Sequence, residues 1–109
     1  MALLSTPNPQ TAFPVRCTSA TLSSLASLAT SQTLIAANTA RLGLVVHNTD
    51  ANALYIKFGA TATTAIGGYT YKIPSDGTWE MTPTIVYTGI IDAIWLADGS
   101  GGASITELS

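Results

Sequence analysis

Charged side chains are scarce in this sequence. It holds four Lys or Arg and six Asp or Glu in 109 residues, and Arg16 is the only charged residue among residues 1–40. A typical soluble domain carries about 25% charged residues, against 9% here. Because charge keeps separate protein molecules apart in solution, a chain this neutral is expected to cover much of its surface with protein partners.

Positive charge is especially rare, which argues against nucleic-acid binding. The net charge is −2, and the basic residues are scattered along the chain: Arg16, Arg41, Lys57 and Lys72. Neutralising a phosphate backbone requires a cluster of basic residues on one face. We therefore expect no nucleic-acid partner.

Cysteine and histidine occur once each, as Cys17 and His47. A single cysteine forms no intrachain disulfide, and one Cys with one His does not complete a tetrahedral zinc site. We predict that Cys17 is a small buried apolar residue in a strand. Asn48, Asp50 and Asn52 have the alternating oxygens of a calcium loop but lack its glycine and closing glutamate, so a turn explains them better. No metal or cofactor is expected.

No hydrophobic run is long enough to cross a bilayer. The longest weakly apolar stretch, residues 22–37, is interrupted throughout by Ser and Thr, whereas a membrane span needs about 20 mainly apolar residues. Residues 1–5 have no basic segment and only a short apolar run, so we expect no signal peptide.

A catalytic centre is also not predicted. His47 could use Asp50 or Asp92 in a triad with a serine, but the sequence contains no Gly-x-Ser-x-Gly turn to present the nucleophile. Asp92 interrupts the most apolar strand, and a buried carboxylate must be paired; Arg41 or a backbone turn is the expected partner. We predict no enzyme, no catalytic residue and no small-molecule substrate.

Residues 1–14 are predicted to form an extended N-terminal arm, ahead of a single domain over residues 15–109. Pro7, Pro9 and Pro14 fix the backbone and remove amide donors, which favours an extended segment over a helix or an inner strand. The arm is either a frayed tail or a strap that lies on a neighbouring protein.

Short runs of alternating hydrophobicity dominate the rest of the chain and indicate strands. Leu42, Leu44 and Val46 are predicted to face the core, and residues 20–31 to be irregular. Two hairpins are predicted, one around the turn at 49–52 and one around Asp76-Gly77, and the glycine-rich residues 99–102 are read as a flexible hairpin tip. The predicted strands are residues 15–18, 33–36, 41–48, 53–58, 69–73, 78–82, 90–97 and 103–107.

This pattern predicts an all-β fold: an antiparallel, jelly-roll-like β-sandwich or a small barrel of about 7–9 short strands. The aromatic side chains are the most informative surface candidates, because such rings are favoured at the centres of protein contacts. Tyr55, Tyr69, Tyr71 and Trp79 are predicted to line one outward face, where subunit contact is favoured over sugar stacking. The partner-contact residues predicted in the arm are Leu3, Leu4, Pro7, Pro9 and Phe13.

Four runs of the chain resemble short β-rich virion proteins of tailed bacteriophages, of the capsid decoration (cement) or accessory head type. They are RLGLVVHN at 41–48, LYIKFG at 54–59, YTGIIDAIW at 87–95 and GASITE at 102–107. The resemblance implies a subunit that is added, as a trimer or dimer, to a preformed shell of major capsid protein. It supplies no catalytic residue.

The expected function is therefore non-covalent decoration and stabilisation of a phage capsid, on the virion surface after assembly in the bacterial cytoplasm. Two alternatives remain open. One is a tail or fibre-attachment adaptor of the virion, and the other is a carbohydrate-binding module that uses the exposed rings.

Overall fold

The computed structural model describes residues 16–109, and within this range it contains eight strands and no helix, so the prediction of an all-β chain is confirmed. The predicted arm, with Leu3, Leu4, Pro7, Pro9 and Phe13, lies outside the described residues. The strands are β1 (Ala20–Ala26), β2 (Gln32–Ile35), β3 (Gly43–Asn48), β4 (Leu54–Phe58), β5 (Tyr71–Ile73), β6 (Thr78–Glu80), β7 (Ile91–Trp95) and β8 (Gly102–Leu108).

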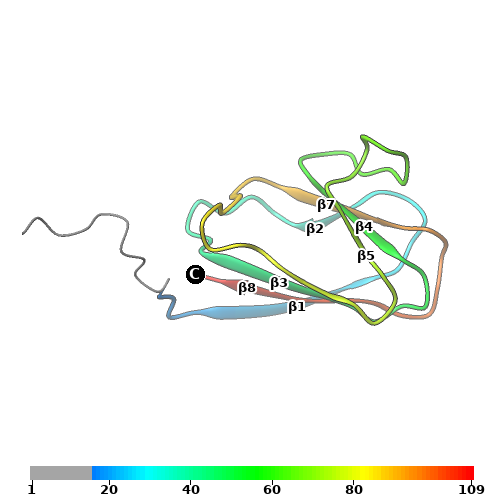
Figure 1. Cartoon of the computed structure of the whole chain (residues 1–109). Coiled ribbons are helices and arrows are strands. Elements are labelled where there is room, and N and C mark those ends of the chain that lie inside the picture. Colours follow the sequence, from blue (N-terminus) through cyan, green and yellow to red (C-terminus); the bar gives the residue numbers. More distant parts are fainter. Residues whose placement is uncertain (1–15) are drawn as a thin grey trace, which may run out of the picture.

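The strands form two four-stranded sheets, and every pairing between them is antiparallel. One sheet has the order β1-β8-β3-β6 and the other the order β2-β7-β4-β5. The sheets lie one above the other in a sandwich-like arrangement (Figure 1). Within residues 16–109 they do not close into a barrel, so the barrel alternative is wrong.

The hydrophobic core lies between the sheets, and alternation along each strand selects its members. Leu44 and Val46 of β3 face Ile56 of β4 and Trp95 of β7 across it, and each is at most 1% exposed. Leu42, which shares their alternation, is 37% exposed because it precedes the start of β3. The strand predicted at 90–97 is central, since β7 lies between β2 and β4.

Both predicted hairpins are wrong, because the strands on either side of each turn belong to different sheets. β3 pairs with β6 and β8, whereas β4 pairs with β5 and β7. β5 and β6 are separated in the same way. Residues 49–53 and 74–77 therefore carry the chain from one sheet across to the other. Alternation predicts which side chains face inward but not which strand lies alongside.

Two predictions near the N-terminal end of the domain are also wrong. Residues 20–26, expected to be irregular, form β1, whose backbone pairs with β8 along its whole length. The strand expected at 15–18 is not formed by its described residues, 16–18, and Cys17 is exposed instead of buried. Pairing with β8 overrides the weak local preference of the Ser-rich sequence.

Buried polar side chains join the two sheets at both ends of β3. Before it, the Arg41 side chain is 0% exposed, and its Nε donates to Glu107 of β8 at 2.8 Å. Its Nη atoms donate to three backbone carbonyls next to β2 and β7, at Ala36 (2.7 Å), Tyr87 (2.7 Å) and Gly89 (3.1 Å). One guanidinium therefore bridges both sheets.

Asn48 makes the corresponding link at the other end of β3. Its Oδ1 accepts a hydrogen bond from the Trp95 indole at 3.1 Å, and its Nδ2 donates to the carbonyls of Asn52 (2.9 Å) and Ile73 (3.1 Å). Trp95 and Ile73 belong to the second sheet, so both ends of β3 are fixed to it by satisfied polar groups.

Residues 16–109 include no helix long and apolar enough to cross a membrane.

Arg41→Met is expected to lower the free energy of unfolding by about 3–5 kcal/mol, because it leaves Glu107 and three partly buried carbonyls without their donor. Urea unfolding followed by tryptophan fluorescence measures the change. Lys57→Met is the control, since Lys57 bonds only the Ala60 carbonyl from a partly exposed position. Equal losses in both variants would show that Arg41 does not hold the sheets together.

Candidate interaction surface

The four rings predicted to share one outward face do not lie on one surface. Tyr55 and Tyr71 lie on opposite faces of the second sheet, and Trp79 belongs to β6 of the first sheet. Tyr55 pairs with Lys72 across β4 and β5, whereas Tyr71 pairs with Ile56, whose side chain is in the core. Directly paired residues of antiparallel strands share a face. Tyr55 and Lys72 are therefore on the outer face and Tyr71 on the inner one, so the prediction of a single four-ring surface is wrong.

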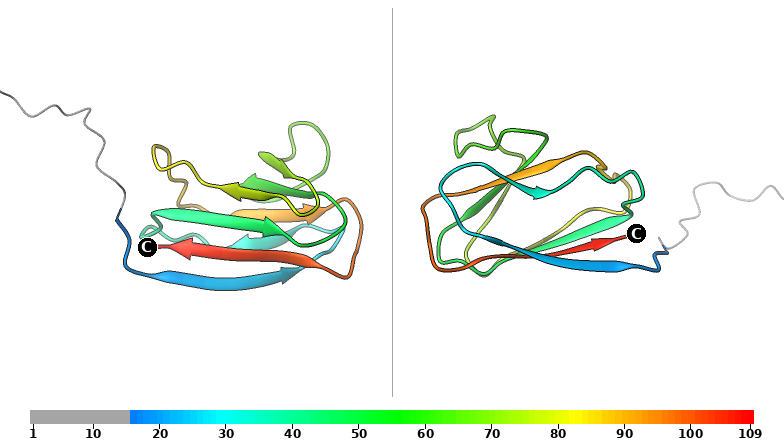
Figure 2. Two further views of the ribbon diagram at one scale, coloured as in Figure 1. Left: turned by 60° about the horizontal axis from the view of Figure 1, so that its bottom comes forward. Right: turned by 180° about the vertical axis from the view of Figure 1, so that it is seen from behind.

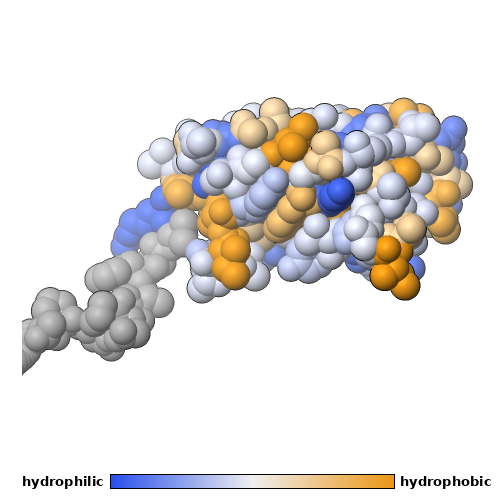
Figure 3. Space-filling model, turned by 90° about the horizontal axis from the view of Figure 1, so that it is seen from above, coloured by the Kyte–Doolittle hydropathy of each residue, from blue (hydrophilic) through white to orange (hydrophobic). Residues whose placement is uncertain are grey.

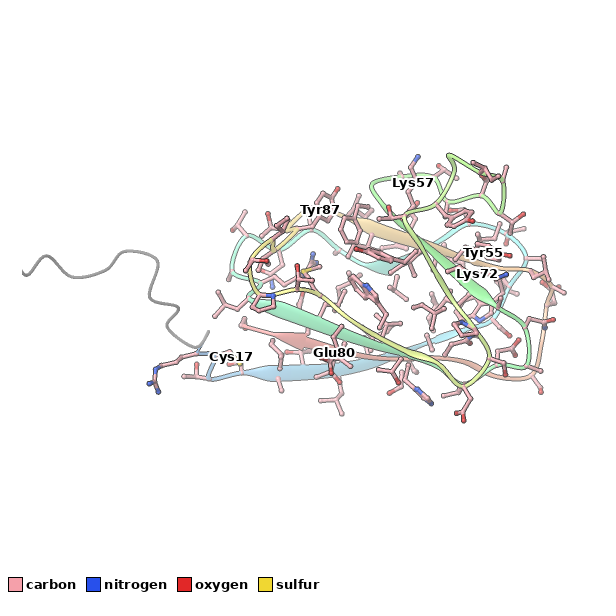
Figure 4. The ribbon with its side chains drawn as sticks, in the orientation of Figure 1. Cys17, Tyr55, Lys57, Lys72, Glu80 and Tyr87 are labelled. Atoms are coloured by element: carbon pink, nitrogen blue, oxygen red, sulfur yellow. The ribbon has the colours of Figure 1, made fainter. Side chains whose placement is uncertain are left out.

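Tyr55 faces outward, as expected, but other groups cover it. The ring of Tyr69, at the end of the 59–70 loop, packs edge-on against it with centroids 4.8 Å apart. The Lys72 ammonium lies 5.7 Å from the Tyr55 centroid, and Figure 4 shows the two side chains next to each other. Tyr55 is only 7% exposed, so it is not available to a partner.

The other two rings belong to an aromatic cluster between β5 and β6, at one edge of the core. Phe58 stacks on Tyr87 with centroids 4.7 Å apart, and Trp79 packs against Phe58 at 5.9 Å and Tyr71 at 5.2 Å. Only Tyr71 in this cluster is exposed, at 42%. Tyr71 is thus the predicted contact ring that remains open, while Trp79 is partly covered by its neighbours.

His47 contacts a carboxylate, but a different one from those considered in the sequence. Its Nε2 lies 3.2 Å from Asp76 and its Nδ1 lies 2.7 Å from the Thr78 hydroxyl. A hydroxyl, an imidazole and a carboxylate in line are the components of an activated nucleophile. However, the Asp76 side chain is 92% exposed, and this line of groups lies on the open outer face of the first sheet.

Two shallow depressions occur on the first sheet, and neither includes His47. One, of about 260 Å³, lies at the start of β3 and is mainly apolar, lined by Leu42, Val45, Met81, Pro83 and Leu108 with Cys17 and Glu80. The other, of about 310 Å³, lies along β1 and β8 between Ser24 and Ser104. Neither contains two carboxylates. The lining of the first includes Cys17 and Glu80, and no histidine lines either depression.

The buried carboxylates serve the fold. Asp92 was expected to pair with Arg41 or a backbone turn. It does not pair with Arg41, which bonds Glu107 instead. Asp92 lies opposite Lys57 in the β4–β7 pairing, and its Oδ2 accepts from the Ser31 hydroxyl at 3.5 Å. Its buried Oδ1 has no hydrogen-bond partner among the described residues.

Asp50 organises the corner between β3 and β4. Its Oδ1 accepts from the Ser27 hydroxyl (3.0 Å) and the Gly101 amide (2.8 Å), and its Oδ2 accepts from the backbone and side chain of Asn52, both at 2.9 Å. The Asn52 amide holds the pKa of this carboxyl below its ordinary value, against the opposing effect of burial. Donors within the protein thus occupy the oxygens that resembled calcium ligands.

The glycine-rich residues 99–102 pack against this corner, so their description as a flexible tip is wrong. A Cβ atom on Gly101 would lie 2.8 Å from the Cα of Asp50 and 2.7 Å from the Thr49 carbonyl. Glycine is required there because the two backbones approach too closely for a side chain.

Sequence reasoning missed one surface, the outer strand β1. Leu22 is 71% exposed, and the residues of β1 are exposed except for the half-buried Leu25. The lack of charge after Arg16 was the signal in the sequence that could have indicated this surface. Leucines at 22, 25 and 28 have the spacing of a helical turn, and this spacing obscured the strand.

The exposed apolar residues of the described surface are dispersed. Figure 3 shows them as separate patches on the face that carries the second sheet. The large exposed ones are Leu22, Leu28, Leu42, Ile66, Tyr71, Ile85 and Leu96.

Comparisons of the chain with family models, curated proteins and solved structures found no match.

Gly101→Ala is expected to lower the free energy of unfolding by about 1–3 kcal/mol, because the added methyl group must displace the Asp50 corner. Chemical denaturation measures the loss. Ser100→Ala, one residue away and exposed, should change it little. A stable Gly101→Ala variant would show that the loop is free to move away.

Asp50 should also make the fold sensitive to acid. Because its folded pKa is below the ordinary value of 3.8, its contribution is present above that pH and is lost as the pH falls toward the folded value. Asp50→Asn should therefore be less stable than the unmodified chain at pH 7 and should lose less stability between pH 5 and pH 2. Urea midpoints across this range test this, with the exposed Glu80→Gln as control; parallel pH profiles for Asp50→Asn and the unmodified chain would contradict it.

Proposed function

We propose that this chain is a structural virion protein that attaches non-covalently to the outside of a phage capsid and stabilises it as a decoration subunit. The observation that carries the proposal is the small number of charges left on the surface. Its contacts are to the major capsid protein and to other copies of itself, and it acts without a cofactor or a chemical step.

The fold buries or pairs several of the few charged side chains, so even fewer charges remain on the surface. Arg41, Asp50 and Asp92 are buried, and Glu107 is ion-paired with Arg41. The remaining charged residues of the described part are evenly divided between the signs: Arg16, Lys57 and Lys72 against Asp76, Glu80 and Asp98. A surface of this kind imposes little desolvation cost on a protein partner and little repulsion between copies.

We also infer that the two sheets form a jelly roll. Successive strands alternate between the sheets, except for β4 and β5, which pair within the second sheet. The resulting strand orders, β1-β8-β3-β6 and β2-β7-β4-β5, suit the two Greek keys of that fold. Jelly rolls occur in viral capsid proteins and in lectins. This support is an analogy at the level of fold, and the site itself must carry the function.

The surface favours protein contact over sugar stacking. Carbohydrate binding requires open ring faces, yet Tyr55 is covered and Trp79 is packed between Phe58 and Tyr71. Tyr71 is the most exposed of the four predicted rings, at 42%, and its ring also packs against Trp79. Trp79→Ala should therefore lower the free energy of unfolding, so a loss of glycan binding in this variant would not by itself identify a sugar site.

The test is binding to purified phage shells that lack their decoration subunit. The unmodified chain should bind at hundreds of copies per shell, because a lattice presents the same contact many times. Sedimentation with the shells followed by quantitative gel analysis gives the copy number. A handful of copies at one vertex would instead indicate a tail or fibre adaptor, and no binding to any shell or virion would reject a virion role.

Deleting residues 1–13 is expected to reduce occupancy on the shells if the predicted arm is a strap. Removal of Leu3, Leu4 and Phe13 takes away apolar contact area at each of many sites. The urea midpoint of the truncated chain is the control, because it should match that of the full chain. Full occupancy after deletion would reject the strap.

A further inference from the structure

The longest free edge in the described structure is strand β1. It is the outermost strand of the first sheet, with β8 on one side only (Figure 2). It runs for seven residues, and every residue except Leu25 is exposed. No charged residue occurs between Cys17 and Ala40.

The hydrogen bonds to β8 show which backbone groups of β1 remain free. Ser19 and Ser109 exchange two bonds of 2.9 Å, and the Ser27 amide donates to the Gly101 carbonyl at 3.1 Å. Bonding alternates along an antiparallel pair, so odd-numbered residues of this segment bond β8. The even-numbered residues direct their N–H and C=O groups away from β8: Ala20, Leu22, Ser24 and Ala26. Of these groups, the Ala26 carbonyl already accepts a hydrogen bond from the Gln32 side chain at 2.9 Å.

The other three edges carry features that discourage pairing, whereas β1 has none. β2 is interrupted by a register shift between Thr33 and Ile35. β5 and β6 are three residues each; β5 carries Lys72 and is followed by Pro74, and β6 carries Glu80 and is followed by Pro83. Short strands, bulges, charges and prolines are the usual protection of a sheet edge. The unprotected, uncharged β1 is therefore the edge open to another strand.

We propose that a second copy of this chain pairs with β1 in the antiparallel direction, about a two-fold axis at Ser23. In this register Leu22 of each copy lies opposite Ser24 of the other, and Ala20 lies opposite Ala26. All four outward-directed residues find a partner, and each facing pair exchanges two hydrogen bonds. The Ala26 carbonyl takes part through its second lone pair, beside the bond from Gln32. A two-fold axis elsewhere on the strand leaves some of these groups without a partner.

The side chains of β1 suit pairing with itself. Leu22 of one copy is the diagonal neighbour of Leu22 of the other on the outer face, within reach of a long side chain. On the inner face, Thr21 lies opposite Leu25 of the second copy. The absence of charge means that no like charges meet at the two-fold axis, and the same strand serves both copies, as an isologous interface requires.

This inference goes beyond the proposed function and does not rest on it, because it uses only the strand, its bonding pattern and its composition. The two joined sheets would form one continuous sheet across the dimer. In this arrangement, attachment to a capsid would use surfaces other than the β1 edge.

Ser24→Pro tests the pairing in the full chain. The Ser24 amide points away from β8, so proline removes a donor to the second copy without removing a bond within the chain. The dissociation constant of the dimer, measured by sedimentation over a range of concentrations, should rise at least about tenfold. Ser23→Pro is the matched control: its amide bonds β8, so it should lower the unfolding midpoint, whereas Ser24→Pro should leave it nearly unchanged.

A second variant pair tests the side chains. Leu22→Lys brings two ammonium groups together across the axis and should also weaken the dimer at least about tenfold. Ile66→Lys adds the same charge at a residue that is 98% exposed in the 59–70 loop and should have no effect.

Amide hydrogen exchange of the unmodified chain reads the interface directly. The amides of Leu22, Ser24 and Ala26 should become protected as the concentration rises, whereas that of Ser23 should be protected throughout. Three results would overturn the proposal: a monomer at all concentrations with freely exchanging even-numbered amides, a dimer that Ser24→Pro and Leu22→Lys leave intact, or a dimer lost only on removal of residues 1–14. A β1 dimer that binds no shell would support this pairing and reject the proposed function.

Discussion

The buried guanidinium of Arg41 is the contact on which the arrangement of the two sheets depends. It joins β8 of one sheet to the carbonyls that flank β2 and β7 of the other, from a position just before β3. Asn48 does the same at the far end of that strand through Trp95. β3 is therefore fixed at both ends by polar groups whose hydrogen bonds are directional. Apolar packing alone would bring the sheets together without setting their relative position.

The buried charged groups that stabilise the fold are also charges that are absent from the surface. Arg41 and Glu107 neutralise each other, and Asp50 is satisfied by amides and a hydroxyl. What remains outside is small, hydroxylated and apolar, with few charges of either sign. The stability of the single chain and the low charge of its surface thus have a common origin in where a handful of ionised groups are placed.

Alternation in the sequence was enough to predict seven of the eight strands, from β2 to β8, and much of the core, including Leu44, Val46 and Trp95. It did not reveal neighbours: β3 and β4 are adjacent in sequence yet lie in different sheets, because the Asp50 corner directs the chain across the core. The prediction of a single aromatic surface was wrong for a related reason. Tyr55 is covered by Tyr69 at the end of the 59–70 loop, and the sequence does not specify the path of that loop. β1 was missed because its partner, β8, is distant in the chain.

The place of β8 between β1 and β3 has a consequence for how the protein is made. The first sheet joins segments that are more than half the chain apart, and its central strand is the last to be synthesised. Until residues 102–108 leave the ribosome, β1 and β3 have no strand between them, and the inner face of the other sheet stays uncovered. Topologies with such distant pairings reach their native state slowly. The nascent chain therefore passes through an interval in which the core residues that pack against Ala103 and Ile105 of β8 lack that contact.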